Sequence, residues 1–140
     1  MDVKDIAVPF VAWAVCGSLK FVVNFIRAGG SIAEARRLIG YGGFPSTHTA
    51  VLSSAVFFAG FTLGFDTPVF TLGLGTLVIL VMDAHGLRQK VGVQAKAINE
   101  LRRAVGIEGA PLRERMGHAW HEIGGGLAVG LAVGYIASWL

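Results

Sequence analysis

Charged residues are scarce in this chain, at 15% of its 140 residues, whereas a soluble domain usually carries about 25%. This scarcity argues against a large water-facing surface, and the mean hydropathy of +0.63 agrees with it. A single cysteine, Cys16, excludes a disulfide framework within the chain. The N-terminus lacks the basic start and the small-residue cleavage site of a secretory signal. We therefore expect the first apolar stretch to persist as a membrane helix.

Apolar stretches dominate what is present. They cover residues 6–26, 45–63, 69–82 and 123–140. A transmembrane helix needs about 20 residues, so about four such helices would use over half of the chain. The pattern predicts an all-α fold in which residues 1–140 form one domain, an integral membrane bundle of about four transmembrane helices.

Residues 88–105 follow a different pattern. Val91, Ile98, Leu101 and Val105 lie on one helical stripe, and the basic residues lie elsewhere around the helix. Such a segment is typical of an amphipathic helix on a membrane surface. We expect this helix on the cytoplasmic side.

Glycines recur at every fourth residue in two of the predicted spans. Small residues at this spacing let helix backbones approach closely. They indicate packing within one chain, or across a homodimer through glycine-rich helix faces. The glycines concerned are Gly60, Gly64, Gly126, Gly130 and Gly134.

The basic residues indicate an orientation in the membrane. All Lys and Arg residues except Lys4 and Lys20 fall in two connectors, residues 27–44 and 83–122. The positive-inside rule places these connectors in the cytoplasm and both termini outside. We expect a protein of a bacterial-type inner (plasma) membrane, whose connectors contact anionic lipid rather than nucleic acid.

Polar side chains gather at those ends of the predicted spans that face the cytoplasm. Ionisable groups at such positions are costly unless they have a function. Lys20 and Arg27 are seven residues apart and share one helical face, so they can clamp a phosphate between two cations. The alternative is that they snorkel to the lipid headgroups.

The second span begins with Pro45, Ser46, Thr47 and His48. A helix start offers free backbone N–H groups to an anion, and the hydroxyls of Ser46 and Thr47 can add donors. His48 can give a proton to a leaving oxygen. The alternative is a Ser/Thr helix cap beside an incidental histidine.

His118 and Glu122 are four residues apart at the start of the last span. On one helix, Glu122 can accept a hydrogen bond from one imidazole nitrogen and leave the other free to attack. His121 is the poorer candidate, because it points about 60° away from His118. The alternative is an ordinary exposed pair.

Asp83 and Arg88 end the third span. Asp83 can orient a basic residue, and Arg88 can hold phosphate oxygens. A structural ion pair between them is the alternative. The spacing of Asp83, Glu114 and Glu122 does not support a metal site, and no metal is expected.

Three segments together resemble the divergent type 2 phosphatidic acid phosphatase family, a relative of the lipid phosphatase and vanadium-dependent haloperoxidase superfamily. Residues 42–48 read Gly-Gly-Phe-Pro-Ser-Thr-His and resemble the family's Gly-Gly-Met-Pro-Ser-Ser-His box. Its second box resembles residues 83–88 followed by Gly92, Gln94, Ala95 and Asn99, and its third resembles residues 112–118 followed by Glu122. The boxes occur in the right order over nearly the whole chain.

The larger superfamily has three motifs, and this chain departs from them at single positions. Lys20 and Arg27 keep the spacing of the first motif, but Ala28 replaces its proline. Thr47 replaces the glycine of the second motif, and Glu122 replaces the aspartate of the third.

The third motif also departs at its arginine. Leu112 stands at that position, so an arginine that grips the phosphate must come from elsewhere. Arg113 and Arg88 are the candidates.

The resemblance implies a phosphoric-ester hydrolase, a membrane lipid phosphatase that needs no cofactor. His118 would attack phosphorus and become a phosphohistidine, with Glu122 orienting it. His48 would protonate the leaving group and then activate water. Lys20, Ser46 and an arginine would hold the phosphoryl oxygens, so that catalysis is positioning plus charge neutralisation.

The implied substrate is a membrane lipid that bears a phosphate monoester or diphosphate, of the phosphatidylglycerol phosphate, phosphatidic acid or prenyl phosphate type. The active site would face the cytoplasm. Two other functions fit the same polar layer: a small membrane anion or lipid transporter, and a non-catalytic membrane scaffold. Neither needs a nucleophile with an orienting carboxylate, so the histidine pair separates them from an enzyme.

Overall fold

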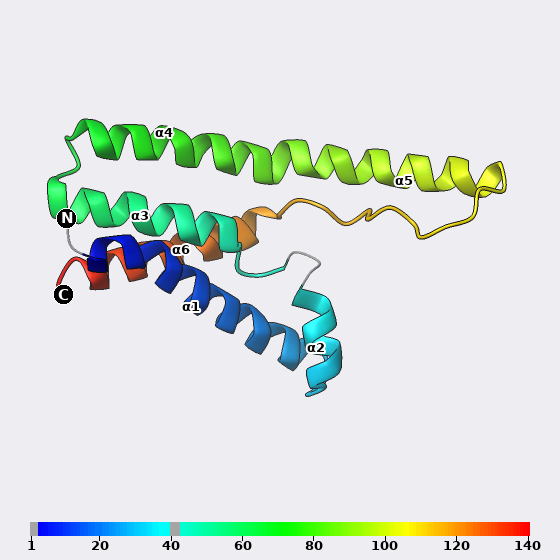
Figure 1. Ribbon diagram of the computed structural model, residues 1–140, viewed down its shortest axis with the longest axis horizontal. Coiled ribbons are helices and arrows are strands. Elements are labelled where there is room, and N and C mark those ends of the chain that lie inside the picture. Colours follow the sequence, from blue (N-terminus) through cyan, green and yellow to red (C-terminus); the bar gives the residue numbers. More distant parts are fainter. Residues whose placement is uncertain (1–2, 40–42) are drawn as a thin grey trace.

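The computed structural model describes residues 3–39 and 43–140, and all regular structure in these ranges is helical. The all-α prediction is therefore confirmed. A five-residue π-helical segment, Asp83–Leu87, joins α4 to α5 and is called the π-turn below. The helices are α1 Val3–Arg27, α2 Ile32–Ile39, α3 Thr47–Leu63, α4 Pro68–Met82, α5 Arg88–Ala104 and α6 Trp120–Ala137 (Figure 1).

The glycines of α6 explain why it lies directly against α3. Gly126, Gly130 and Gly134 are all buried, and a Cβ atom on any of them would collide with atoms of the α3 region. For Gly130 the obstacle is the hydroxyl of Ser53. Small residues thus let the two backbones touch, and packing within the chain is confirmed. A homodimer through glycine-rich faces stays a prediction.

Helix α1 crosses α3 and α6 with one buried stripe (Figure 1). Its members recur at every fourth residue, as the turn of an α-helix requires. The stripe begins apolar and ends polar, so the buried polar side chains of α1 lie in its C-terminal half. The buried residues are Val8, Ala12, Cys16, Lys20 and Asn24.

Two helical stretches of the described ranges are long and apolar enough to cross a membrane, Asp5–Arg27 and Pro68–Ala104, and α3 is apolar but shorter. Large apolar side chains such as Phe10, Trp13 and Leu72 are exposed on them. Exposed apolar surface of this extent fits contact with lipid. Two candidate spans support a membrane-associated helical protein; the count of four stays a prediction.

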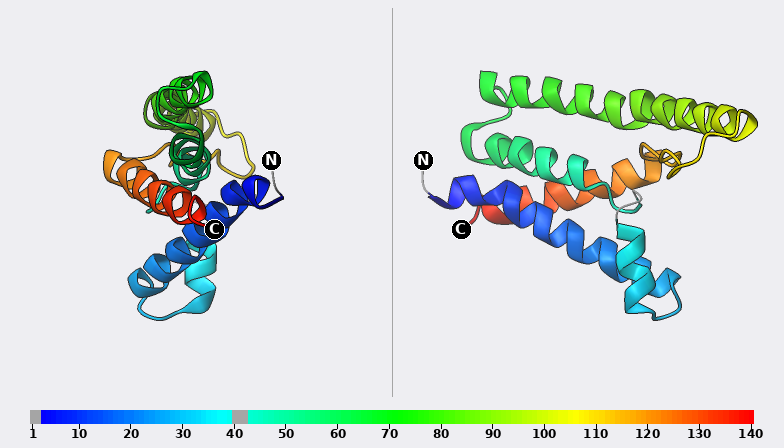
Figure 2. Two further views of the ribbon diagram at one scale, coloured as in Figure 1. Left: turned by 90° about the vertical axis from the view of Figure 1, so that its left-hand side faces the viewer. Right: turned by 45° about the vertical axis from the view of Figure 1, so that its right-hand side comes forward.

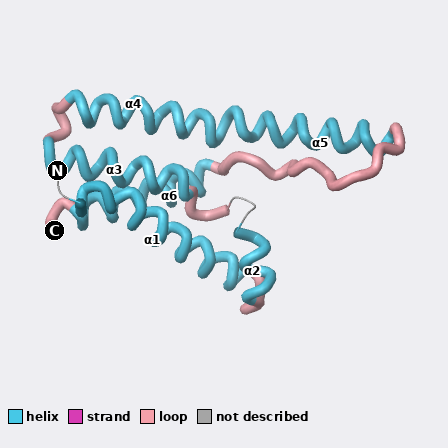
Figure 3. Tube along the Cα trace, viewed as in Figure 1, coloured by secondary structure: helices cyan, strands magenta, loops and turns pink. Residues whose placement is uncertain are grey.

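Helices α4 and α5 form one long rod, where the sequence indicated an apolar span and a separate surface helix (Figures 1 and 2). The predicted amphipathic helix exists as α5, but it continues the line of α4. Residues 105–119 then return beside α5 without helical structure (Figure 3). Gly92 makes this possible, because a Cβ there would collide with the main chain of Glu114.

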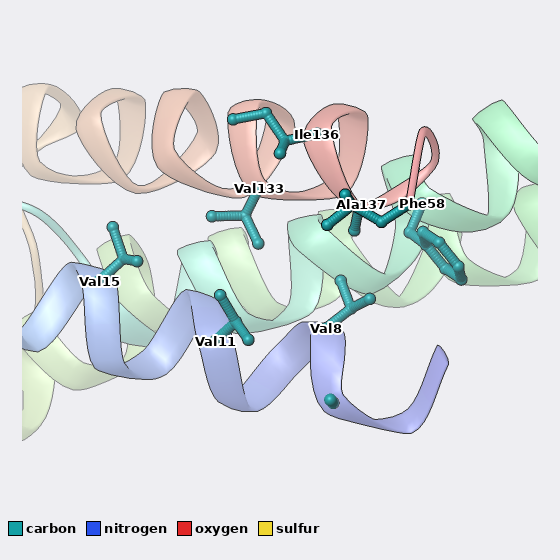
Figure 4. Close-up of a pocket in the computed structure, with 9 residues that line it drawn as sticks. Val8, Val11, Val15, Phe58, Val133, Ile136 and Ala137 are labelled. Carbon is teal, nitrogen blue, oxygen red and sulfur yellow. The ribbon is translucent and has the colours of Figure 1, made fainter. Parts of the chain in front are cut away.

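An apolar pocket lies between α1, α3 and α6 at the end of the bundle that holds both termini (Figure 4). Val8 and Val11 of α1, Phe58 of α3 and Val133 of α6 contribute to its wall. Every side chain lining it is apolar. The buried polar side chains Lys20 and Asn24 lie toward the other end of α1.

Candidate active site

The segment before α3 is tied directly to the start of α6. The Ser46 N–H donates to the Glu122 carbonyl oxygen at 2.8 Å. The buried Ser46 is also the N-cap of α3: its hydroxyl oxygen accepts from the Thr49 N–H at 3.4 Å and from the Thr49 hydroxyl at 2.9 Å. The capping role, which the sequence left open, is therefore present. Both contacts of the Ser46 hydroxyl are with Thr49, in the first turn of α3.

The imidazole of His118 is paired with the carboxylate of Glu122. Nδ1 of His118 lies 2.9 Å from Oε2 of Glu122, and both residues are only 6% exposed. The same carboxylate oxygen accepts from the Ala119 N–H at 3.2 Å. A hydrogen bond at Nδ1 leaves Nε2 as the nitrogen available for chemistry.

The sequence predicted that His118 and Glu122 lie on one helix, but in the structure they do not. His118 lies in the segment before α6, Ala119 is the N-cap, and Glu122 belongs to the first turn. Gly117, at a φ of 83°, turns the chain just before His118. Glu122 folds back over the helix start, as a glutamate at this position commonly does. The predicted contact between His118 and Glu122 is therefore present, but it does not arise from a four-residue spacing within one helix.

His48 meets His118 across the site. The two imidazole centroids are 6.2 Å apart and the rings are tilted by 58°. His48 is exposed and is the second residue of α3. Electrostatic interactions link it with Lys20, Arg88 and Asp83. Polar groups from α1, α3, the π-turn and the segment before α6 therefore converge.

Lys20 belongs to this convergence, whereas Arg27 lies outside it. Lys20 is 7% exposed and interacts electrostatically with Glu122. Its side chain forms no hydrogen bond or ion pair with the side chains and main chain that the structure describes. Arg27 is exposed at the end of α1, where the helix diverges from α3 and α6 (Figure 1). The seven-residue spacing therefore does not bring both cations into the same buried group.

Asn24, and not Arg27 as the sequence predicted, is the second polar residue of α1 that is buried beside Lys20. Asn24 is 4% exposed, one turn beyond Lys20 on the buried stripe of α1. Its Nδ2 has no hydrogen-bond partner among the described residues. The four-residue repeat that begins at Val8 could have predicted that Asn24 is buried. The residue was missed because an uncharged amide does not stand out in an apolar helix.

Arg88 is the arginine that reaches the group of converging side chains. Its Nε donates to Oδ2 of Asp83 at 2.8 Å, and both side chains are about one-third exposed (39% and 35%). Arg88 also interacts electrostatically with His48. Arg113 is exposed in the returning segment, where its Nε donates to the Arg115 carbonyl oxygen at 3.1 Å. The ion pair between Asp83 and Arg88 is therefore present, and through it Asp83 can orient the Arg88 guanidinium.

Asn99 holds the returning segment in place and was not predicted as a site residue. Its Nδ2 donates to the Leu112 carbonyl oxygen at 2.8 Å and to Oε1 of Glu114 at 2.9 Å. Its Oδ1 accepts from the Leu112 N–H at 2.8 Å. In the described part of the chain, no group of three or more His, Cys, Asp or Glu side chains is arranged to hold a metal ion.

Comparison with known proteins identifies the family of this chain. The family model described as "Divergent PAP2 family" matches residues 1–133. The uncharacterized membrane protein YuiD of Bacillus subtilis (strain 168) is 35% identical over 60 residues, which are 43% of this chain and 38% of that protein. The chain thus matches well under two thirds of its relative's length. No solved structure matches the chain. Because the family model covers nearly the whole sequence, the chain belongs to the divergent PAP2 family.

Proposed function

We propose that this protein is a membrane lipid phosphatase that works through a phosphohistidine. The supporting observation is the arrangement of two imidazoles, 6.2 Å apart between ring centroids, one of which is bonded through Nδ1 to Glu122 at 2.9 Å. A nucleophile oriented by a carboxylate, beside a second proton-transfer group, is typical of covalent catalysis.

In the first step, Nε2 of His118 attacks phosphorus and forms an N–P bond. The P–O bond to the lipid alcohol breaks, or in a diphosphate the P–O bond to the lipid phosphate, and His48 gives its proton to the departing oxygen. Lys20 and Arg88 neutralise charge on the equatorial oxygens, which is the main contribution a protein makes to phosphoryl transfer. Glu122 stabilises the imidazole in the orientation that points Nε2 at phosphorus.

In the second step, His48 accepts a proton from water, and the water oxygen attacks phosphorus. The N–P bond breaks, inorganic phosphate leaves, and His118 returns to its starting state. No redox partner takes part in either step. Thr47, Arg27 and Arg113 are secondary candidates for contacts with the phosphate or the headgroup. Ser46 contributes by capping α3.

The substrate is a lipid phosphate monoester or diphosphate of the phosphatidylglycerol phosphate, phosphatidic acid or prenyl phosphate type. A lipid fits because the polar group lies at one end of helices whose outer surfaces are apolar. We place the site in the cytoplasmic leaflet of a bacterial-type inner membrane, with about four spans and both termini outside.

The test is phosphate release by the purified protein in detergent micelles, with phosphatidic acid, phosphatidylglycerol phosphate and prenyl diphosphates as substrates. We expect His118→Ala to reduce the rate by about 10³-fold or more, because it removes the nucleophile. The matched control is His121→Ala: this neighbouring histidine is exposed and stacks on Phe44 with ring centroids 6.4 Å apart. The control should keep activity within a few-fold of wild type, and vanadate should inhibit both active proteins.

Two results would contradict the proposal. Wild-type protein that releases no phosphate from any of these lipids would favour an anion or lipid transporter, or a non-catalytic scaffold. Equal activity of wild-type protein and the His118→Ala variant would exclude His118 as the nucleophile while leaving hydrolysis in place.

A further inference from the structure

The π-turn and the first turn of α5 hold both main-chain polar groups of His118. The His118 N–H donates to the Ala84 carbonyl oxygen at 2.9 Å. The His118 carbonyl oxygen lies 3.2 Å from Nδ1 of His85 and accepts from Nε2 of Gln89 at 3.2 Å. The backbone of this residue is therefore fixed on its N–H side and on its C=O side.

The shape of the π-turn makes the first of these bonds possible. In the π-turn the Arg88 N–H donates to Asp83, five residues earlier, as π-helical bonding requires. The next carbonyl, that of Ala84, accepts from outside the helix. Gly117 lets the chain come this close, because a Cβ there would lie 3.0 Å from the Ala84 carbonyl oxygen and 2.8 Å from Cγ of Gln89.

Two side chains, Gln89 and His85, lie within hydrogen-bond distance of the His118 carbonyl oxygen, and Gln89 is the one that donates in every protonation state. Nδ1 of His85 also lies 3.3 Å from Nε2 of Gln89, and an imidazole nitrogen can donate only when it carries the proton. Gln89 donates through its amide whichever nitrogen of His85 is protonated. The His85 ring is itself held against Trp120, with centroids 4.3 Å apart.

We infer that Gln89 is a positioning residue for His118: by holding the main-chain carbonyl it keeps Nε2 in line with the phosphorus atom. The inference rests on the proposed role of His118 as nucleophile. Gln89 touches no reacting atom. Its effect arises because a displacement of about 1 Å in a reacting group can reduce a rate by about 10²-fold.

The test compares Gln89→Leu and Gln89→Glu with Gln94→Leu in the full-length protein. Leucine removes the donor, and glutamate keeps the shape but places a carboxylate against the carbonyl oxygen. Gln94→Leu is the matched control, because it is the same substitution at another exposed position of α5, and the Gln94 side chain has no hydrogen-bond partner in the described part of the chain. Phosphate release and hydrogen–deuterium exchange of the His118 amide are measured for each protein.

For both Gln89 variants we expect kcat to fall about tenfold or more, with KM within about threefold of wild type. Exchange of the His118 amide should be several-fold faster, because its segment opens more often. The melting temperature should not change, since Gln89 is exposed. The control should match wild type in every measurement.

Wild-type kcat and wild-type exchange in both Gln89 variants would overturn the inference and leave the phosphatase intact. A loss of kcat with an equal loss in Gln94→Leu would also overturn it. Absence of phosphate release from wild-type protein would refute the proposed function. The exchange measurement would then still decide whether Gln89 holds His118.

Discussion

Two buried asparagines in this protein have opposite surroundings. Asn24 and Asn99 are both 4% exposed. The Asn99 amide forms three hydrogen bonds to Leu112 and Glu114, two donated by Nδ2 and one accepted by Oδ1. Nδ2 of Asn24 has no partner in the described ranges. A buried donor that is left unpaired costs about 1–3 kcal/mol, whereas a paired one stabilises the fold.

Substitution of each asparagine by leucine should therefore change stability in opposite directions. We expect Asn99→Leu to lower the free energy of unfolding by about 2 kcal/mol, because it leaves the main chain of Leu112 unpaired. Asn24→Leu should leave the free energy of unfolding unchanged or raise it. Thermal unfolding can be followed by the reaction of the single buried cysteine, Cys16, with a thiol reagent. Equal destabilisation by both substitutions would contradict the account.

Residues with charge or an imidazole could be predicted from the sequence, and neutral amides could not. Lys20, His48 and Glu122 stand out because ionisable groups at the ends of apolar helices are rare. Gln89 acts on a backbone carbonyl that is brought to it by a turn at Gly117. Because the partner of Gln89 is a main-chain carbonyl, no pattern of side chains in the sequence predicts this contact.

At the scale of elements, the pairing of α3 with α6 sets the distance between His48 and His118. The helices can approach because Gly126, Gly130 and Gly134 carry no side chain on the shared face. The contact begins at the hydrogen bond from the Ser46 N–H to the Glu122 carbonyl. Anything that separates the two helices should therefore separate the two imidazoles.

Two glycine-to-alanine substitutions on α6 test this pairing. Gly130→Ala should lower the free energy of unfolding by about 1–3 kcal/mol, because its methyl group has no room beside Ser53. Gly124→Ala is the matched control, since a Cβ there meets nothing within 4 Å. It should be neutral or stabilising by up to about 1 kcal/mol, as expected for alanine in a helix. Equal effects of the two substitutions would contradict close packing at Gly130.

The helical elements were predictable from apolar periodicity, but their joints were not. The sequence predicted an amphipathic helix from residue 88, and α5 begins at Arg88. It did not predict that Asp83–Leu87 would continue the helix as a π-turn. The pattern of apolar residues predicts which residues share a helix face. It does not predict whether a helix continues in a straight line through a polar segment. The returning residues 105–119 bond along this continuous rod, through Asn99 of α5 and through Ala84 of the π-turn, and the apolar pattern does not report such polar contacts.

In the described part of the molecule, the candidate site and the apolar pocket lie toward opposite ends of the helices α1, α3 and α6. The pocket in Figure 4 is lined by apolar side chains alone and lies near both termini. The histidines, Lys20 and Arg88 gather where α1, α3 and α6 approach the π-turn. A lipid phosphate could place its headgroup at the polar end while its chains run along the exposed apolar helices. The proposed function requires that His118, at the polar end of these helices, forms a covalent bond to phosphorus.

The most direct test of that claim is to look for the phosphorylated enzyme. Protein mixed with phosphatidic acid labelled in its phosphate is quenched in alkali, which preserves an N–P bond, and its peptides are analysed by mass spectrometry. We expect label on the peptide that contains His118 in the wild-type protein and no label in His118→Ala. Phosphate turnover with no label on His118, or with label on another residue, would contradict it.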